Sequence, residues 1–148
     1  MNILSKEEIL NKGKNCITEI GYDPLTGLYV EMDTNVPYNG IGYTVFDNGE
    51  IESYSFYVDG IEDIQTVEFY YNGKPKTYYD MKNGLIDGKI IKWNEEGIMT
   101  YCAECEASVI KTFKEWNEQG ELINEKKEPT TDELRKIERI KMEGRFIG

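Results

Sequence analysis

Glycines recur along this chain at nearly constant intervals, and this spacing limits the folds that the chain can adopt. Gly49, Gly73, Gly97 and Gly120 are separated by 24, 24 and 23 residues. Each glycine ends a similar segment rich in aromatic residues: YTVFDNG, VEFYYNG, IKWNEEG and FKEWNEQG. A fixed period of roughly 20 to 50 residues is typical of repeat proteins, in which each repeat is one supersecondary unit. The spacing therefore predicts a stack of similar hairpins.

The Asn-Gly pairs predict where these hairpins turn. Asn48-Gly49 and Asn72-Gly73 favour two-residue type I′ turns, because both central residues of such a turn need positive φ. Counting outward from the turns, and carrying the same register into the two later repeats, gives the cross-strand pairs. The predicted pairs are Phe46–Ile51, Val45–Glu52, Tyr43–Tyr54, Phe69–Lys76, Val67–Tyr78, Trp93–Thr100, Ile91–Cys102 and Trp116–Ile123.

This register sorts the side chains onto two faces, since neighbours along a strand point to opposite sides of the sheet. The predicted packed face collects Ile41, Tyr43, Val45, Tyr54, Phe56, Val67, Phe69, Tyr78, Ile91, Trp93, Trp116 and Ile123. The other face is mixed, polar and rich in tyrosine: Thr44, Phe46, Ser53, Glu68, Tyr70, Thr77, Tyr79, Lys92, Tyr101 and Glu115. A one-residue slip of the register would exchange the two faces.

Capping signals predict a helix at each end of the chain. Ser5 and Glu8 have the spacing of a capping box, which favours a short helix within residues 1–14. Thr130 and Glu133 repeat the pattern after the polar segment EKKEP, and apolar residues then follow at helical spacing.

The chain is therefore expected to form one domain, residues 1–148, that is mainly β. An N-terminal helix within 1–14, a hairpin-repeat sheet over 16–124 and a C-terminal helix within 130–143 are its predicted parts. The sheet is an elongated, open antiparallel meander, because each hairpin alone is marginal and stacking stabilises it. The C-terminal helix is expected to cover an end or a face of this sheet.

Charge divides the chain into two unlike halves. The net charge is −11, and no Lys or Arg occurs between Asn15 and Gly73, although acidic residues are frequent there. Such a one-signed surface attracts a basic partner and opposes direct binding to nucleic acid, whose phosphates need Lys and Arg. The acidic residues could instead only solubilise the sheet, but solubilising surfaces usually mix both signs.

The reactive side chains argue against most catalytic classes. The chain contains no histidine, which excludes Ser-His-Asp and Cys-His catalysis and the commonest metal ligand. Cys102 and Cys105 form a CxxC without a second pair, and on a strand they would face opposite sides. We expect no catalytic residues, no metal site, no cofactor and no enzymatic activity. A catalytic pair of carboxylates has no sequence signature, so a hydrolase remains open.

Targeting signals are also missing from the sequence. The segment MNILSKEEILNKGK lacks the apolar core of a signal peptide, and no stretch approaches the length of a membrane span. Three cysteines, an odd number, are expected to stay reduced. We therefore expect a cytoplasmic protein.

The unit NGLIDGKIIKWNEEGIMTY, with its period and turn glycines, resembles the bacterial variant of the MORN-type repeat. The resemblance covers roughly residues 40–124 and extends weakly to residues 21–39, where Thr26-Gly27 precedes the strand-like LYVEM. The third unit departs from the pattern, because Ser108 stands where Gly60 and Gly84 predict glycine, and AECEAS is expected to be a longer or irregular connection. The resemblance implies an open β-meander and the class of antitoxins, or of immunity proteins beside secreted polymorphic toxins.

The charge and the resemblance together suggest an immunity protein or antitoxin. It would bind a cognate toxin domain, basic and of the nuclease type, through an acidic, tyrosine-rich surface, with neither nucleic acid nor membrane as a direct partner. Tyrosine offers contact area with a polar tip, and carboxylates bind Arg and Lys. The expected contact residues are Asp47, Glu50, Glu52, Tyr54, Asp59, Glu62, Asp63, Glu68, Tyr70 and Tyr71. A scaffold for protein or membrane interaction and an acidic mimic of nucleic acid remain alternatives, and the oligomeric state is open.

Overall fold

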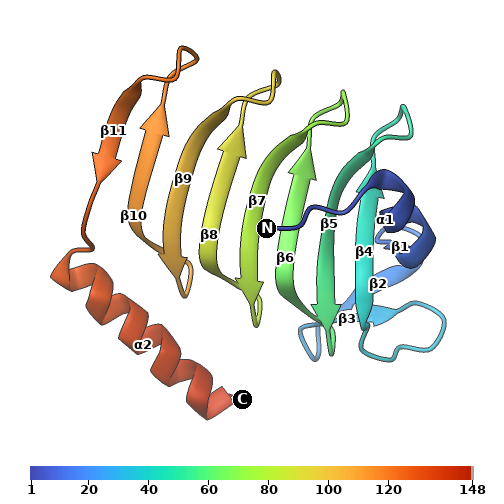
Figure 1. Ribbon diagram of the computed structural model, residues 1–148. Helices are drawn as coiled ribbons and strands as arrows, with labels where there is room; N and C mark the ends of the chain where they lie inside the picture. Colours follow the sequence, from blue (N-terminus) through green and yellow to red (C-terminus); the bar gives the residue numbers. More distant parts are fainter. Residues whose placement is uncertain (148) are drawn as a thin grey trace.

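The main body of the molecule is one open sheet of nine strands, eight of which form a meander in chain order (Figure 1). The structure, a computed structural model, describes residues 1–147. The strands of the meander are β4 (Gly40–Val45), β5 (Ile51–Val58), β6 (Ile61–Phe69), β7 (Pro75–Lys82), β8 (Leu85–Trp93), β9 (Met99–Glu106), β10 (Val109–Trp116) and β11 (Leu122–Lys126). All neighbours within it are antiparallel. The prediction of a mainly β, open meander is confirmed.

The chain before β4 departs from the predicted sheet. The two residues of β1 (Lys14–Asn15) pair with β4 in parallel. The next two strands, β2 (Ile20–Asp23) and β3 (Leu28–Glu31), form a separate two-stranded sheet behind β4 and β5 (Figure 1). Residues 21–39 therefore do not continue the stack of hairpins, although they do contain one.

The glycine turns are longer than predicted. Asn48 is not among the residues with positive φ, so the turn is not type I′, whereas Gly49 has φ +86°. The Gly49 amide donates to the Phe46 carbonyl at 3.0 Å, and the Phe46 amide donates to the Glu50 carbonyl at 2.8 Å. This is a three-residue loop, a type I turn followed by a left-handed glycine. Equivalent bonds close the turns at Gly73, Gly97 and Gly120.

A bulge next to each of these turns restores the predicted register. Glu52 has no partner, because Val45 pairs with Ile51 while Thr44 pairs with Ser53. A loop that is one residue longer than a two-residue turn shifts the pairing of the two strands by one position. The extra residue of the bulge shifts the pairing back. Lys76, Thr100 and Ile123 occupy the same bulge position in the later repeats.

The predicted pairs therefore divide into two groups. Those beyond the bulge are confirmed: Tyr43–Tyr54, Val67–Tyr78 and Ile91–Cys102. Those between turn and bulge are wrong: Phe46–Ile51, Val45–Glu52, Phe69–Lys76, Trp93–Thr100 and Trp116–Ile123.

The turns at the opposite end of the strands are all two-residue turns. Asp59-Gly60, Asn83-Gly84 and Ala107-Ser108 each have positive φ at both positions, as type I′ requires. The expectation of an irregular connection in AECEAS is therefore wrong. Ser108 adopts φ +64° without being glycine, and its hydroxyl accepts a hydrogen bond from the Ile86 amide, near the start of β8, at 3.0 Å.

The helix face, which we define as the face carrying Tyr54, Val67 and Tyr78, holds the largest apolar cluster. Ile41, Ile51, Phe69 and Ile91 are buried with these residues, and Tyr43, Phe56 and Trp93 pack against them partly buried. Two of the predicted members are mainly outside the core, since Val45 is 38% exposed and Ile123, the bulge residue, is 59% exposed. The assignment of the packed face is otherwise largely correct.

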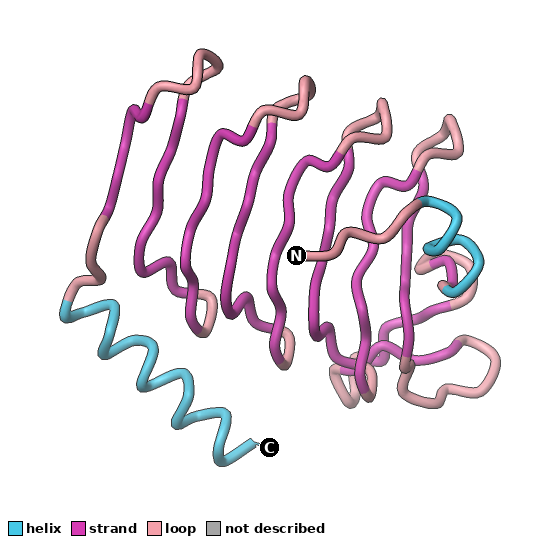
Figure 2. The backbone as a smooth tube through the Cα atoms, viewed as in Figure 1, coloured by secondary structure: helices cyan, strands magenta, loops and turns pink. Residues whose placement is uncertain are grey.

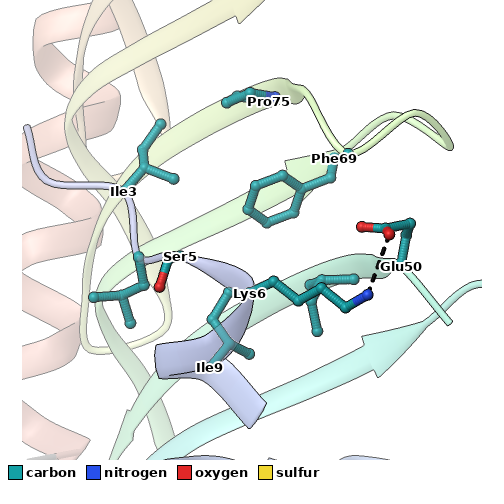
Figure 3. A pocket seen from close by; sticks show the side chains of 10 residues that line it. Ile3, Ser5, Lys6, Ile9, Glu50, Phe69 and Pro75 are labelled. Carbon is teal, nitrogen blue, oxygen red and sulfur yellow. Dashed lines mark hydrogen bonds and ion pairs between the residues drawn. The ribbon is translucent and has the colours of Figure 1, made fainter.

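The N-terminal segment covers this face over the first half of the sheet (Figure 2). Helix α1 (Lys6–Lys12) begins with the predicted capping box of Ser5 and Glu8, and its Ile9 is completely buried in the cluster. Figure 3 shows Ile3 and Ile9 pointing toward Phe69. The Leu4 amide donates to the Tyr54 hydroxyl at 3.0 Å, which ties the extended residues before the helix to the sheet.

Helix α2 (Thr131–Ile147) lies along the end of the strands that carries the two-residue turns (Figure 1). Its Ile137 is buried with Ala107 and Val109. Thr130 and Glu133 form the predicted capping bonds at 3.1 and 2.8 Å. The helix thus covers an end of the sheet, and it runs past the predicted limit of residue 143. No helix among the described residues has the length and apolar character to span a membrane.

Ile9 should contribute most of the docking energy of α1. We expect Ile9→Ala to lower the free energy of unfolding by about 2–4 kcal/mol, since it empties a fully buried site. Leu10→Ala, on the exposed side of the same helix, is the control and should cost less than about 1 kcal/mol. Urea unfolding followed by circular dichroism measures both, and equal losses would show that α1 is not docked as described.

Protonation of Glu133 should lower the free energy of unfolding in acid. The hydrogen bond from Lys126, at 2.5 Å, and the hydrogen bond from the Thr130 amide together lower the pKa of the Glu133 carboxyl from 4.5 to about 2. A lowered folded-state pKa means stability that is present above about pH 4.5 and is lost as the pH falls toward 2. Urea midpoints at several pH values should therefore depend less on pH in Glu133→Gln than in Glu138→Gln, which removes an exposed carboxylate of the same helix.

Candidate functional site

A groove of about 400 Å³ lies on the face of the sheet opposite α1, between that face and the β2–β3 hairpin. We call this the hairpin face, and it carries Ser53, Ser55 and Tyr57. The hairpin-face groove is lined by Cys16, Ile20, Gly21, Tyr22, Tyr29, Thr44, Ser53, Ser55, Tyr57, Glu62, Thr66 and Glu68. All these residues belong to the stretch without Lys or Arg. Pockets that bind small molecules usually have volumes of roughly 300 to 1,000 Å³, and the volume of this groove lies within that range.

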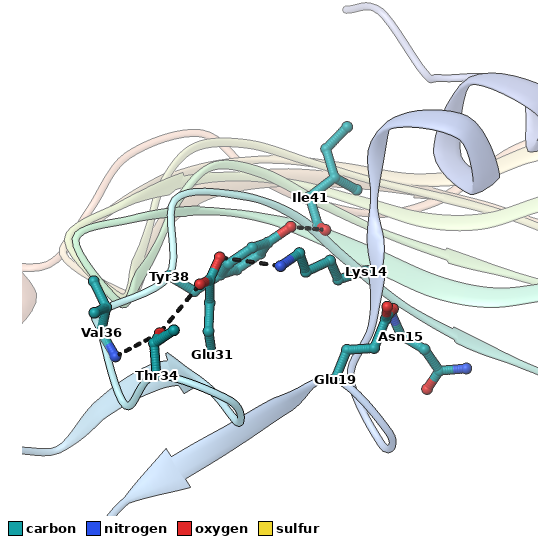
Figure 4. Close-up of polar contacts among 8 residues, drawn as sticks. All are labelled: Lys14, Asn15, Glu19, Glu31, Thr34, Val36, Tyr38 and Ile41. Carbon is teal, nitrogen blue, oxygen red and sulfur yellow. Dashed lines mark hydrogen bonds and ion pairs between the residues drawn. The ribbon is translucent and has the colours of Figure 1, made fainter.

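The wall of the groove on the hairpin side is a chain of tyrosines. The rings of Tyr22 and Tyr29 lie 5.3 Å apart, and those of Tyr29 and Tyr57 lie 5.1 Å apart. Tyr38, which is buried and does not line the groove, packs against Tyr57 at 5.9 Å, and its hydroxyl donates to the Ile41 carbonyl at 2.7 Å (Figure 4). These contacts are within the range of favourable aromatic pairs. They hold the hairpin against the sheet.

The absence of a side chain at Gly42 lets the hairpin approach the sheet. A Cβ there would lie 2.8 Å from the Tyr57 ring, 2.9 Å from the Cys16 sulfur and 3.0 Å from Ile20. Cys16, Ile20 and Tyr57 belong to the small core that joins the hairpin to the sheet.

The floor of the groove is a ladder of hydroxyl groups. Thr44 and Ser53 are paired across β4 and β5, and their hydroxyls lie 2.9 Å apart. Ser55 and Thr66 are paired across β5 and β6, with hydroxyls 2.7 Å apart. Each hydroxyl keeps a lone pair for a further donor, so the floor can accept hydrogen bonds.

Two carboxylates, Glu62 and Glu68, complete the lining. Glu62 accepts the Thr66 hydroxyl at 3.5 Å, and Glu68 accepts the hydroxyls of Thr77 and, at 3.4 Å, of Tyr79. Neither glutamate takes part in an ion pair among the described residues. Their negative charge is therefore compensated only by neutral hydrogen-bond donors.

Lysines from the N-terminal segment neutralise other acidic residues of the first half. Lys6 lies 3.1 Å from Glu50, and Lys14 lies 3.1 Å from Glu31 (Figures 3 and 4). Both lysines precede the cation-free stretch in sequence and return to it in space. The field of that stretch is thus reduced at Glu50 and Glu31 and persists at the hairpin-face groove.

The Cys16 thiol and the Tyr29 and Tyr57 phenols of the groove stay protonated at neutral pH. Burial raises the pKa of the Cys16 thiol, and the charge of Glu62 raises it further, while a hydrogen bond with Tyr57 lowers it. Burial also raises the pKa of Tyr57 and of Tyr29, again with a contribution from Glu62. A protonated thiol is a poor nucleophile. The groove therefore offers polar contacts and negative charge rather than an activated nucleophile.

The ten residues predicted for partner contact do not form one surface. Glu62 and Glu68 line the groove. Asp47 and Tyr71 meet at the edge formed by the glycine turns, where the Tyr71 hydroxyl donates to Asp47 at 2.7 Å. Tyr70 lies at the same edge and donates to the Trp93 carbonyl at 2.7 Å.

The other predicted contact residues are scattered or covered. Glu52 is an exposed bulge residue, and Asp59 is exposed in the turn between β5 and β6. Asp63 pairs with Phe56 and so lies on the helix face. Tyr54 is only 1% exposed beneath the N-terminal segment, and as a core residue it is removed from the candidate surface.

Sequence reasoning missed the tyrosines and the thiol that the hairpin contributes. Tyr22, Tyr29 and Cys16 are distant from Glu68 in sequence, and the position of the hairpin depends on packing rather than on a motif. Tyr57 could have been found, because the Asp59-Gly60 turn pairs it with Glu62 on one face. Cys102 and Cys105 do lie on opposite faces, as strand alternation predicts.

No protein-family model matches this sequence, and no match was found among curated proteins or among solved structures.

The absence of a side chain at Gly42 should be needed for the β2–β3 hairpin to pack against the sheet. We expect Gly42→Ala to lower the free energy of unfolding by about 1–3 kcal/mol, because its methyl group overlaps the core under the hairpin. The rate at which Cys16 reacts with a thiol reagent should rise as the hairpin is displaced. Gly21→Ala is the control, since its Cβ would lie 3.6 Å from its nearest neighbour, Met32. Similar thiol rates in the two variants would contradict the described contact.

Proposed function

We propose that this protein is an immunity protein or antitoxin that neutralises a basic toxin domain, of the nuclease type, by binding it without catalysis. The single observation that carries the proposal is the negative charge of Glu62 and Glu68 in the hairpin-face groove, which no ion pair among the described residues compensates. An acidic surface of one sign steers a basic partner to it and selects against acidic ones. A nuclease domain is basic where it holds its polyanionic substrate, so the same acidic surface would compete with that substrate.

The open sheet supports binding by surface contact. A stable interface of standard size buries about 800 Å² on each partner. The accessible surface of this protein is 9369 Å², so such an interface would occupy roughly a tenth of it. The hairpin face, with its hydroxyls, tyrosines and carboxylates, offers the mixture of side chains that favours specific contacts.

The resemblance of residues 40–124 to bacterial MORN-type repeats supports the proposed class, that of antitoxins and immunity proteins. Repeats of that kind are frequent in antitoxins and in immunity proteins, which act inside the producing cell. We accordingly place the action of this protein in the cytoplasm. Binding to anionic lipid, the other property that MORN-type repeats suggest, is opposed by the net charge of −11.

Coexpression with the toxin domain encoded beside this gene tests the proposal. The wild-type protein should restore growth and should bind the purified domain with a dissociation constant below about 1 μM, the level of a specific complex. Its association rate should fall by about tenfold or more between low and high salt, because screening removes the steering. An unrelated acidic protein of similar charge is the control and should not restore growth.

Two results would contradict the proposal. The first is no binding at micromolar concentration in moderate salt. The second is equal binding to many unrelated basic domains, which would instead favour an acidic mimic of nucleic acid.

A further inference from the structure

The tyrosines that line the groove differ from three other tyrosines of this chain in their contacts with lysine. Three tyrosine rings each have a lysine ammonium over them: Lys14 over Tyr38 at 5.8 Å, Lys76 over Tyr70 at 5.6 Å, and Lys92 over Tyr101 at 5.1 Å. Among the described residues, no such contact involves Tyr22, Tyr29 or Tyr57. Within residues 1–147, the carboxylates of Glu62 and Glu68 also take part in no ion pair. Aromatic rings and carboxylates, the two groups that attract a cation, thus line the same groove.

The chemistry of the lining selects among cations. A guanidinium group is planar, carries five N–H donors and stacks on aromatic rings. The groove offers aromatic rings on one wall, hydroxyl acceptors on the floor and two carboxylates, which together match those properties. A lysine ammonium is a compact and strongly hydrated charge with three donors, and it would use the tyrosine wall less well.

We propose that the hairpin-face groove receives an arginine side chain of the partner, between the tyrosine wall and the carboxylates of Glu62 and Glu68. This inference rests on the proposed function, because it names the group by which the basic partner is held. The groove volume of about 400 Å³ accommodates one such side chain together with water. The rest of the acidic surface then contributes steering, while the groove contributes specific contacts.

Short cationic peptides test the groove directly. Fluorescence anisotropy in about 0.15 M salt, where long-range steering is screened, should show that labelled hexa-arginine binds the wild-type protein more tightly than labelled hexa-lysine. The double variant Glu62→Gln/Glu68→Gln should weaken the binding of hexa-arginine by about tenfold or more, since it removes charge-assisted hydrogen bonds. Glutamine keeps the acceptors that Thr66, Thr77 and Tyr79 use, so the fold is expected to persist.

A matched variant separates the groove from general charge. Asp47→Asn/Glu96→Gln makes the same change in net charge at exposed positions outside the groove, and it should weaken the binding of hexa-arginine by less than about threefold, as rim charges do. Tyr22→Ala, at a ring that is 59% exposed at the rim, should reduce the preference for arginine over lysine. Thermal unfolding of every variant confirms that it is folded. Equal weakening by the two double variants, or no preference for hexa-arginine, would overturn the proposal.

The same variants distinguish this proposal from the function on which it rests. If the wild-type protein binds hexa-arginine in the groove and does not bind the neighbouring toxin domain, the proposed function fails and the arginine site stands. If Glu62→Gln/Glu68→Gln neutralises the toxin as well as the wild-type protein does, the proposed function stands and the groove is not the point of attachment.

Discussion

The conformation of one glycine in each repeat governs the register of the whole sheet. Gly49 and its counterparts adopt positive φ and close three-residue turns. The bulge that follows each turn, at Glu52 in the first repeat, cancels the shift in pairing that the longer turn introduces. Because side chains alternate along a strand, this cancellation decides which residues face α1 and which face the hairpin. Tyr54 and Val67 thereby reach the core, and Ser53 and Glu68 reach the groove.

The same alternation lets two adjacent residues serve different purposes. Glu62 and Asp63 are neighbours, yet Glu62 lies with Tyr57 on the hairpin face and Asp63 lies with Phe56 on the helix face. The N-terminal segment then treats the two faces unequally. It covers part of the helix face with Ile9 and places Lys6 beside Glu50, while Glu62 and Glu68 in the groove take part in no ion pair among the described residues.

Much of the fold could be predicted because its signals are local. Capping boxes at Ser5 and Thr130 mark both helices, and the period of the glycines marks the hairpins. The prediction was wrong where two local choices compensate each other. An Asn-Gly pair favours a two-residue turn, but here a longer turn and a bulge give the same pairing beyond it, so Tyr43 still pairs with Tyr54 while Val45 does not pair with Glu52.

The candidate site was less predictable than the fold. Glu62 and Glu68 were predicted from charge, but charge could not distinguish them from Glu50, whose partner Lys6 is 44 residues away in sequence. Tyr22 and Tyr29 reach the groove only because the hairpin folds over Gly42. By itself, the sequence determined the repeats, the two helices and the cation-free stretch, since each depends on residues close together in the chain. Only the tertiary structure decided which carboxylates remain uncompensated and which tyrosines face them, because both depend on distant segments packing on opposite sides of one sheet.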